Sequence, residues 1–151
     1  MSDPIDSVSS DRAAREGSRI RYVTDLKGVD WGAMKAALSA DDFDNGRTPV
    51  QLRRSFEASF VACLAYDGDE LIGTARALSD GVCNAYVIDV WTKSSHRRRG
   101  IARAMLGILE ARLPGQHVYL FSDDRADVYR ACGYHERPTG LEKVIGTWLQ
   151  S

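Results

Sequence analysis

Hydrophobic and polar positions repeat along this chain with two periods, one typical of strands and the other of helices. Residues 19–24 alternate polar and apolar, as a half-buried strand does. Apolar side chains then recur at helical spacing in two stretches, 31–38 and 52–60. Thr48 is a candidate N-cap for the second helix, with Pro49 at its first position. This part of the pattern predicts one strand followed by two helices.

The middle of the chain predicts a β-meander. Residues 61–66 and 71–79 are strand-like and are joined by the turn Asp-Gly-Asp-Glu at 67–70, which indicates a hairpin. A second turn at 79–81 leads to residues 86–92, which are mostly β-branched or aromatic and favour another strand. Three consecutive strands are therefore expected to pair in sequence order.

The C-terminal third predicts helices and strands in alternation. Apolar positions from 101 to 113 have helical spacing, and Pro-Gly at 114–115 ends that helix. Residues 117–121 predict a fifth strand, which a right-handed crossover would place parallel to the preceding one. A short helix is expected around 126–131, and the apolar segment 141–149 predicts a closing strand. The whole pattern indicates one α+β domain.

Composition narrows the class of protein. The chain of 151 residues is 44% hydrophobic and 27% charged, as ordinary soluble globular proteins are. Residues 19–151 are long enough for a single domain, and residues 1–18, rich in Ser, Asp and Arg, predict a mobile tail. A net charge of −1 offers no global basic field, so we expect no nucleic-acid partner. No apolar stretch is long enough to span a bilayer, so we expect no membrane partner.

The cysteines bear on metal binding and on the compartment. They are three in number, and none forms a CxxC pair, so neither a zinc site nor a redox motif is expected. Free thiols are typical of a reducing compartment, which predicts a cytoplasmic location. The residues are Cys63, Cys83 and Cys132.

Candidate chemistry gathers in the turn between the strand that ends near Thr92 and the helix that begins near Ile101. The turn contains Arg-Arg-Arg-Gly at positions 97–100. A glycine at a helix start lets the backbone approach a ligand, and the free amide N–H groups and the helix dipole suit a phosphate. The turn is either an anion cradle or a solvated basic surface, and its own residues leave both possibilities open.

Three stretches together resemble the GNAT superfamily of acyl-CoA-dependent N-acetyltransferases. Residues 97–102, Arg-Arg-Arg-Gly-Ile-Ala, fit its pyrophosphate signature Gln/Arg-x-x-Gly-x-Gly/Ala, and residues 89–92, Asp-Val-Trp-Thr, fit the preceding acetyl-CoA-binding strand. Residues 128–134, Val-Tyr-Arg-Ala-Cys-Gly-Tyr, fit its Tyr-x-x-x-Gly-Phe/Tyr segment. Within the superfamily, residues 76–85 followed by Asp89-Val90 resemble the plant and cyanobacterial serotonin (arylalkylamine) N-acetyltransferases. The likeness covers residues 19–149.

The resemblance implies a three-layer α+β fold with a mixed, mostly antiparallel central sheet, a parallel pair at its splayed centre and flanking helices. It also implies acetyl-CoA as co-substrate, with the pyrophosphate on the backbone amides of 98–103 and the pantetheine arm paired with 90–92 like an added strand. Ser122 stands where many relatives have an Asn that contacts CoA. The implied cofactor-binding residues are Val90, Trp91, Thr92, Arg97, Arg98, Arg99, Gly100, Ile101, Ala102, Arg103 and Ser122.

Tyr129 is the candidate general acid of the reaction that the resemblance implies. Its place four residues before Gly133 matches the family's catalytic tyrosine. Its alternative role is that of a core tyrosine packed under the last strand. His96, beside the phosphate turn, occupies a place where the family usually has an aromatic residue or His, so we expect it to pack rather than to act as a base.

Asp89 is a carboxylate inside an otherwise apolar strand. Burying an unpaired charge is costly, so this side chain needs a partner or a wet cleft. It is a candidate catalytic residue that binds the acceptor ammonium or takes its proton. The alternative is a structural carboxylate that caps the backbone or pairs with an arginine. Asp80 and Glu142 are weaker candidates for the same role.

The resulting hypothesis is an enzyme that moves an acetyl group from acetyl-CoA to a small primary amine, an arylalkylamine or a polyamine. A protein lysine or N-terminal acetyltransferase stays open as an alternative acceptor class. A non-catalytic acyl-CoA-binding sensor is the rival from another class, and it would need neither Tyr129 nor Asp89. A nucleic-acid binder is disfavoured because no second basic patch with interleaved aromatic residues is present. A homodimer is left open as the assembly.

Overall fold

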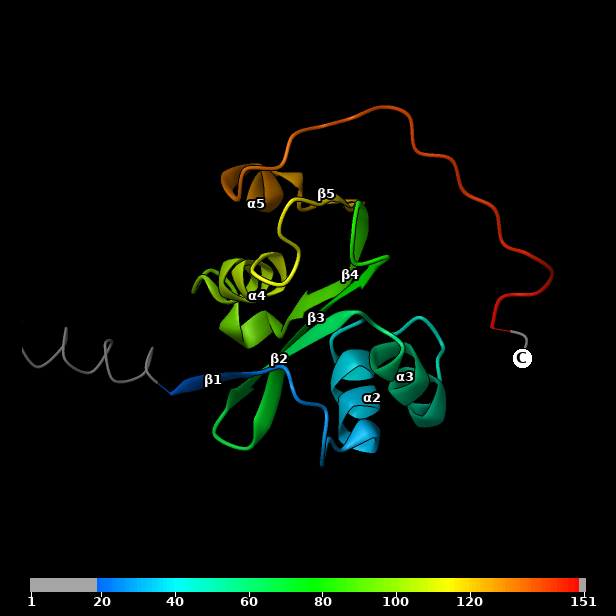
Figure 1. The fold of residues 1–151 in the computed structure, drawn as a ribbon. Helices are drawn as coiled ribbons and strands as arrows, with labels where there is room; N and C mark the ends of the chain where they lie inside the picture. Colours follow the sequence, from blue (N-terminus) through cyan, green and yellow to red (C-terminus); the bar gives the residue numbers. More distant parts are fainter. Residues whose placement is uncertain (1–18, 150–151) are drawn as a thin grey trace, which may run out of the picture.

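A computed structural model describes residues 19–149 of the chain (Figure 1). The predicted mobile tail, residues 1–18, lies outside the described residues. A single sheet of five strands runs in the order β1-β2-β3-β4-β5. The first three pairings are antiparallel and β4 pairs with β5 in parallel, as predicted. The strands are β1 (Ile20–Val23), β2 (Val61–Asp67), β3 (Glu70–Ser79), β4 (Asn84–Thr92) and β5 (His117–Tyr119).

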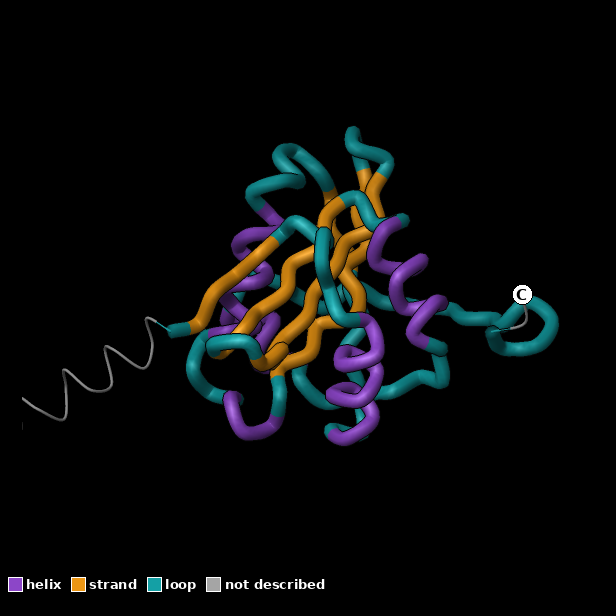
Figure 2. Tube along the Cα trace, turned by 90° about the horizontal axis from the view of Figure 1, so that it is seen from below, coloured by secondary structure: helices purple, strands orange, loops and turns teal. Residues whose placement is uncertain are grey.

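Helices cover both faces of the sheet, which gives the three layers of the expected fold (Figures 1 and 2). Helices α2 (Trp31–Ala40) and α3 (Pro49–Glu57) pack on one face, and α4 (Ile101–Glu110) packs against β2 and β3 on the other. A short 3-10 turn, η1 (Ser94–His96), leads towards α4, and α5 (Ala126–Ala131) follows β5. The mixed, mostly antiparallel sheet with flanking helices confirms the fold class.

Local sequence signals explain where α2 and α3 begin. The Asp30 side chain accepts a hydrogen bond from the Ala33 amide, 2.9 Å away, and so caps α2. Thr48 and Gln51 form a reciprocal capping box at the start of α3, with Pro49 at its first position. The loop between the two helices is thereby held at a defined entry to α3, close to the strand that carries the candidate site.

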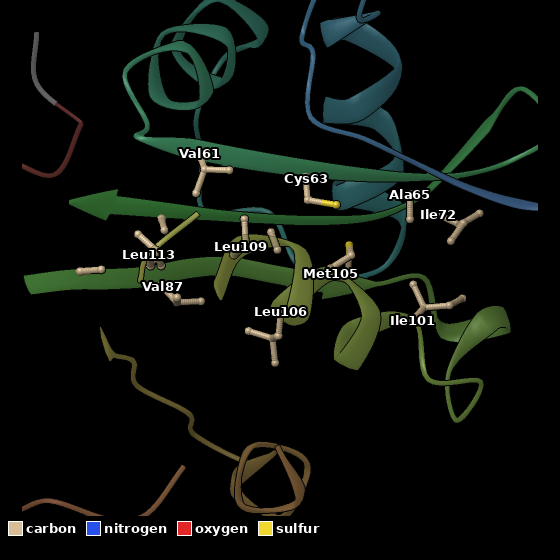
Figure 3. Close-up of a cluster of buried hydrophobic side chains, with 13 residues drawn as sticks. Val61, Cys63, Ala65, Ile72, Val87, Ile101, Met105, Leu106, Leu109 and Leu113 are labelled. Atoms are coloured by element: carbon tan, nitrogen blue, oxygen red, sulfur yellow. The ribbon is translucent and has the colours of Figure 1, made fainter. Parts of the chain in front are cut away.

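The core has two parts, one on each face of the sheet. Figure 3 shows the part between the sheet and α4, where Met105, Leu106 and Leu109 are fully buried. The second part lies under α2 and α3 and includes Phe56 and Trp91, which are 1% and 2% exposed. Because β4 contributes side chains to both parts, its position is fixed from both faces.

A β-bulge interrupts the regular pairing of β3 with β4. Thr74 stands opposite Trp91 and Arg76 opposite Ile88, so the single residue Ala75 faces the two residues between them on β4. One of those two is Asp89, whose φ of 57° lies in the left-handed region. The bulge changes the direction of β4 where the strand carries the candidate catalytic carboxylate.

β4 and β5 separate soon after they begin to pair. Their parallel ladder spans three positions, Asn84 to Tyr86 against His117 to Tyr119. Further along β4, no strand of residues 19–149 pairs with the edge that faces away from β3. The sheet is therefore splayed from Val87 to the end of β4.

The prediction of a closing strand over 141–149 is wrong. This segment contains no strand, and Figure 1 shows it running away from α5 along the outside of the molecule. Its apolar, β-branched composition favours an extended backbone, but a strand also needs a neighbouring edge, which local sequence does not specify. The fifth strand is also shorter than the predicted 117–121, and β5 is one of the two edge strands of the sheet in residues 19–149.

Candidate functional site

The free edge of β4 forms the first part of the candidate site. Val90 and Trp91 lie on the splayed portion of the strand, where the backbone is open to pairing with an extended ligand. The Trp91 indole is buried under α2 and donates a hydrogen bond from Nε1 to Asp41 Oδ2 at 2.8 Å. The Trp91 side chain thus holds this part of β4 in place, while the backbone edge of the strand that faces away from β3 stays unpaired in residues 19–149.

The turn before α4 forms the second part. Arg98 and Gly100 have φ of 63° and 76°, both in the left-handed region, and Gly100 is the N-cap of α4 without a side-chain cap. The amides of Ile101, Ala102 and Arg103 belong to the first turn of the helix, where no intrahelical acceptor exists. A Cβ added at Gly100 would meet no atom within 4 Å, so the space over the turn is open. This arrangement can receive a phosphate.

The arginines of the turn play different parts. Arg97 donates from Nε to the Thr92 carbonyl at 3.3 Å and lies 3.7 Å from Asp41. Arg98 and Arg99 are exposed, and neither forms a side-chain ion pair with residues 19–149. Two of the three charges of the turn are therefore available to a bound anion.

Asp41, which the sequence analysis did not single out, ties α2 to this turn. Its carboxylate accepts hydrogen bonds from the Ser94 amide at 3.0 Å and from the Trp91 indole. Although burial opposes ionisation, hydrogen bonds from Ser94 and Trp91 and the charge of Arg97 hold the pKa of Asp41 below its ordinary value. The acidic residues of the loop after α2 were the sequence signal for Asp41, but the sequence does not reveal which groups its carboxylate contacts.

Asp89 lies between two arginines. Arg47 donates from Nη1 and Nη2 to the two carboxylate oxygens at 3.0 and 2.9 Å, and Arg76 donates from Nε at 2.6 Å. The side chains of Arg47, Arg76 and Asp89 are 6%, 9% and 11% exposed. The Asp89 carbonyl also accepts a hydrogen bond from the Thr74 hydroxyl at 2.8 Å. Both arginines escaped the sequence analysis, although a charge within the apolar strand β3 was a signal for Arg76.

The arginine cluster joins three distant segments. Arg47 Nε donates to the Asn45 side-chain oxygen at 2.9 Å, and the Asn45 carbonyl accepts a hydrogen bond from Trp148 Nε1 at 2.9 Å. The bulge of β4 is thus connected through Arg47 to the loop between α2 and α3, and through Asn45 to the C-terminal segment.

The weaker acidic candidates lie away from this cluster. Asp80 caps the turn between β3 and β4, where its Oδ1 accepts from the amides of Val82 and Cys83, each at 2.8 Å. Backbone hydrogen bonds from Cys83 and Val82 lower the pKa of Asp80, which marks it as a turn-stabilising carboxylate. Glu142 is exposed in the C-terminal segment.

Tyr129 lies in α5 and lines a hollow of about 1060 Å³ beside β5, together with Ser122 and Tyr134. Its ring meets that of Tyr134 edge to face, with centroids 6.2 Å apart. Burial, reinforced by the charges of Cys132 and Asp124, raises the pKa of Tyr129. The phenol therefore holds its proton over the neutral pH range.

Two further predicted residues have defined contacts. The Ser122 hydroxyl accepts a hydrogen bond from the Arg125 amide at 2.9 Å and so supports the entry to α5. His96 is buried, with Nε2 2.9 Å from Asp67 and Nδ1 2.8 Å from the Ser95 hydroxyl, as expected for a packed histidine.

Within residues 19–149, no group of three or more His, Cys, Asp or Glu side chains is placed to hold a metal ion. None of the helices in that range combines the length and apolar character needed to cross a membrane.

A splayed, bulged strand that leads into an uncapped helix start is the arrangement expected of an acetyltransferase. Residues 24–141 match the model of the acetyltransferase (GNAT) family, and the chain belongs to this family. It is 32% identical over 122 residues to serotonin N-acetyltransferase 2, chloroplastic, from Oryza sativa subsp. japonica. That match covers 76% of the chain and spans 60% of the rice protein's length.

Solved structures show the same fold. A protein assigned as an acetyltransferase from Deinococcus radiodurans R1 superposes with a TM-score of 0.73 at 24% identity, covering 84% of this chain and 90% of that one. A predicted acetyltransferase from Clostridium acetobutylicum, solved with acetyl-CoA, has a TM-score of 0.63 at 22% identity and covers 83% and 96% of the two chains. These proteins share the arrangement of layers that positions β4 and α4 here.

Proposed function

We propose that this protein transfers an acetyl group from acetyl-CoA to a primary amine by direct attack, with a small arylalkylamine or polyamine-like acceptor favoured. One observation carries the proposal: the open edge of β4 continues directly into the left-handed turn and uncapped start of α4. An extended pantetheine arm and a pyrophosphate require these two features in this order.

The residues of this region fit acetyl-CoA. The backbone of Val90, Trp91 and Thr92 would pair with the pantetheine arm, and the amides of 98–103 would hold the pyrophosphate. The exposed guanidiniums of Arg98 and Arg99 add charge around that anion. Ser122 lines the hollow beside β5 and is proposed to contact the CoA side of the cleft.

The chemical step needs a neutral amine, a stabilised oxyanion and a protonated leaving thiol. The amine nitrogen forms a bond to the thioester carbon while a backbone N–H near Val90 or Trp91 stabilises the developing oxyanion. The carbon–sulfur bond then breaks, the sulfur of CoA takes the phenolic proton of Tyr129, and the acceptor nitrogen loses its proton to water. Tyrosine regains its proton from solvent, so the step is balanced.

Tyr129 must give its proton in concert with cleavage of the carbon–sulfur bond. A phenol has a pKa of about 10 and a thiol about 8.5, so stepwise transfer would run uphill. Burial raises the pKa of Tyr129 further. The raised pKa keeps the phenol protonated, and cleavage of the carbon–sulfur bond supplies the driving force for the proton transfer.

The contacts of Asp89 support the second of the two roles considered for it. Three N–H donors from two arginines occupy its carboxylate, so it is not free to hold an ammonium group in this arrangement. We therefore assign Asp89 as a positioning residue that holds the bulge of β4 and orients the Val90 backbone towards the thioester.

The acceptor is proposed from the rice relative. The rice protein is named a serotonin N-acetyltransferase, which supports an arylalkylamine. Three free cysteine thiols support the cytoplasm as the compartment. A protein lysine or N-terminal amine is the acceptor class that the test must separate from small amines.

The deciding experiment measures thiol release from acetyl-CoA with tryptamine-type amines, polyamines, a lysine peptide and an N-terminal peptide. Turnover of a small amine at a kcat/KM at least tenfold above the peptides supports the proposal. Preference for a peptide contradicts the acceptor class. Tight acetyl-CoA binding without turnover of any amine contradicts the enzyme and supports the sensor.

Tyr129→Phe tests the general acid. The change removes only the hydroxyl, so kcat should fall by about a hundredfold or more while the Kd for acetyl-CoA is retained. Tyr22→Phe in β1, also partly buried, is the matched control and should leave kcat unchanged. A Tyr129→Phe enzyme with wild-type kcat would remove the assignment.

A further inference from the structure

One loop holds β4 on both sides of Val90. Arg47, near the end of the loop between α2 and α3, donates to both carboxylate oxygens of Asp89 at 3.0 and 2.9 Å. Asp41, at the beginning of the same loop, accepts a hydrogen bond from the Trp91 indole at 2.8 Å. Val90 lies between these two fixed positions, on the stretch of strand whose outer edge is unpaired within residues 19–149. The loop therefore controls the direction of the backbone that carries the proposed oxyanion donor.

The Asp41 carboxylate also reaches the segment that leads into α4. Its Oδ2 accepts a hydrogen bond from the Ser94 amide at 3.0 Å, and its Oδ1 accepts one from the Ser94 hydroxyl at 2.5 Å. Ser94 begins η1, which precedes Arg97, and the Arg97 guanidinium lies 3.7 Å from the same carboxylate. The Asp41 side chain is 12% exposed, so little solvent is available to replace these contacts. One carboxylate thus joins the splayed strand to the turn before α4.

The end of α2 fixes the place of Asp41. The Phe43 amide donates a hydrogen bond to the Leu38 carbonyl at 2.9 Å. The Asp42 amide donates to the Ser39 carbonyl at 3.3 Å, and Asp42 has a left-handed φ of 55°. Together these features form a Schellman motif, which ends α2 in a defined geometry. Since Leu38 is 3% exposed and packs in the core, the motif attaches Asp41 to a rigid part of the domain.

We propose that Asp41 is a positioning residue for acetyl transfer, which aligns the backbone edge at Val90 with the pyrophosphate turn before α4. This role rests on the proposed function, because acetyl-CoA must lie along both features for their alignment to matter. The carboxylate acts through Trp91 and Ser94, not by contact with the reacting atoms. Without it, the indole N–H and the Ser94 amide lose their common acceptor, and the strand and the turn can move independently. A cofactor held at both places then loses its alignment with the oxyanion donor, and small displacements of this kind are costly in catalysis.

Steady-state kinetics of Asp41→Ala and Asp41→Asn test this role. Asp41→Ala should raise the KM for acetyl-CoA about tenfold and lower kcat as well, since both the turn and the oxyanion donor are displaced. Loss of folded protein alone would lower the apparent kcat and leave that KM unchanged, so the KM separates positioning from stability. Asp41→Asn keeps one side-chain oxygen and should recover part of the KM and of kcat. It also provides a folded variant if alanine unfolds the chain.

Asp44→Ala is the matched control from the same loop. The Asp44 carboxylate accepts hydrogen bonds from Lys35 at 2.5 Å, from the Ser39 hydroxyl at 3.1 Å and from the Gly46 amide at 3.0 Å. These partners belong to α2 or to the loop itself, so within residues 19–149 the hydrogen bonds of Asp44 do not reach β4 or the turn. Asp44→Ala should therefore leave the KM for acetyl-CoA unchanged, even where stability falls. A wild-type KM in both Asp41 variants, or an equal rise in Asp44→Ala, would overturn the proposal.

Cofactor binding gives two readouts that need no amine. In proton–nitrogen NMR spectra, the Trp91 indole signal is identified by comparison with Trp31→Phe and Trp148→Phe, and CoA should shift it because the indole and the turn share Asp41. By calorimetric titration, the Kd for CoA should rise several-fold in Asp41→Asn. An unmoved indole signal or an unchanged Kd contradicts the positioning role and leaves acetyl transfer by the wild type standing. If the wild type binds CoA but acetylates no amine, the proposed function fails, while a raised Kd still supports Asp41 as the residue that positions the cofactor turn.

Discussion

At the scale of single residues, Asp89 shows how ion pairing maintains an unfavourable backbone. A left-handed φ at a non-glycine residue costs about 1–2 kcal/mol, and Asp89 adopts φ 57°. The two guanidiniums that bind its carboxylate offset this cost and hold the bulge. The sequence indicated that Asp89 needed a partner, but Arg47 lies 42 positions away, so local pattern could not identify it.

Asp89→Asn should destabilise the protein through the arginines that it leaves behind. Two nearly buried guanidiniums would then have no neutralising carboxylate, and the free energy of unfolding should fall by about 3 kcal/mol. Urea unfolding measures this loss. Asp69→Asn, in the exposed turn between β2 and β3, is the control and should change stability by less than about 0.5 kcal/mol.

The double variant Asp89→Asn with Arg47→Met distinguishes ion pairing from loss of shape. If the penalty comes from unneutralised charge, removing one guanidinium should recover part of the lost stability. Additive losses in the double variant would contradict the pairing argument.

At the scale of elements, α4 combines a binding end and a packing face. Its apolar face predicted the helix correctly, because Ile101, Met105 and Leu109 all lie in the core. Its N-terminal turn was predicted from a motif. The structure explains why the motif contains a glycine, because Gly100 adopts a left-handed backbone conformation. The shortened β5 and the absent closing strand show what local sequence cannot predict. The extent of a strand depends on a neighbouring edge, which residues 117–121 and 141–149 do not encode locally.

Gly100→Ala and Gly107→Ala test the two roles of α4 with the same chemical change. At Gly100 a Cβ is strained by φ 76°, so stability should fall by about 1 kcal/mol and the Kd for CoA should rise several-fold. Gly107 lies inside the helix with open space around its Cβ position, so alanine should stabilise by up to about 1 kcal/mol without changing CoA binding. Thermal unfolding and calorimetric titration with CoA measure both; weaker CoA binding by Gly107→Ala would contradict the assignment.

At the scale of the whole molecule, partly buried tyrosines connect stability to alkaline pH. Burial raises the pKa of five tyrosines, and that of Tyr134 rises to about 12, with Glu110, Cys132 and Tyr129 adding to the effect. Above a pH of about 10 the unfolded chain loses phenolic protons that the folded chain still holds, so stability falls as pH rises. The five residues are Tyr22, Tyr66, Tyr86, Tyr129 and Tyr134.

Ionisation of these tyrosines should leave the free energy of unfolding unchanged below about pH 10 and should lower it between about pH 10 and 12. Urea midpoints measured from pH 8 to pH 11 would show the decline. Tyr134→Phe should flatten it, since the residue with the largest shift no longer ionises in the unfolded chain. Parallel slopes for the wild type and Tyr134→Phe would contradict the role of this tyrosine.

The parallel ladder between β4 and β5 spans only three positions, and this has a consequence for local unfolding. The meander from β1 to β4 is joined by longer antiparallel pairings, whereas β5 and α5 are held by those three pairs and by packing against α4. Segments held by few hydrogen bonds open at lower free energy than the rest of a protein. In native-state hydrogen exchange, amides of β5 and α5 should exchange together and earlier than those of β3, so that residues 117–131 behave as a separate cooperative unit.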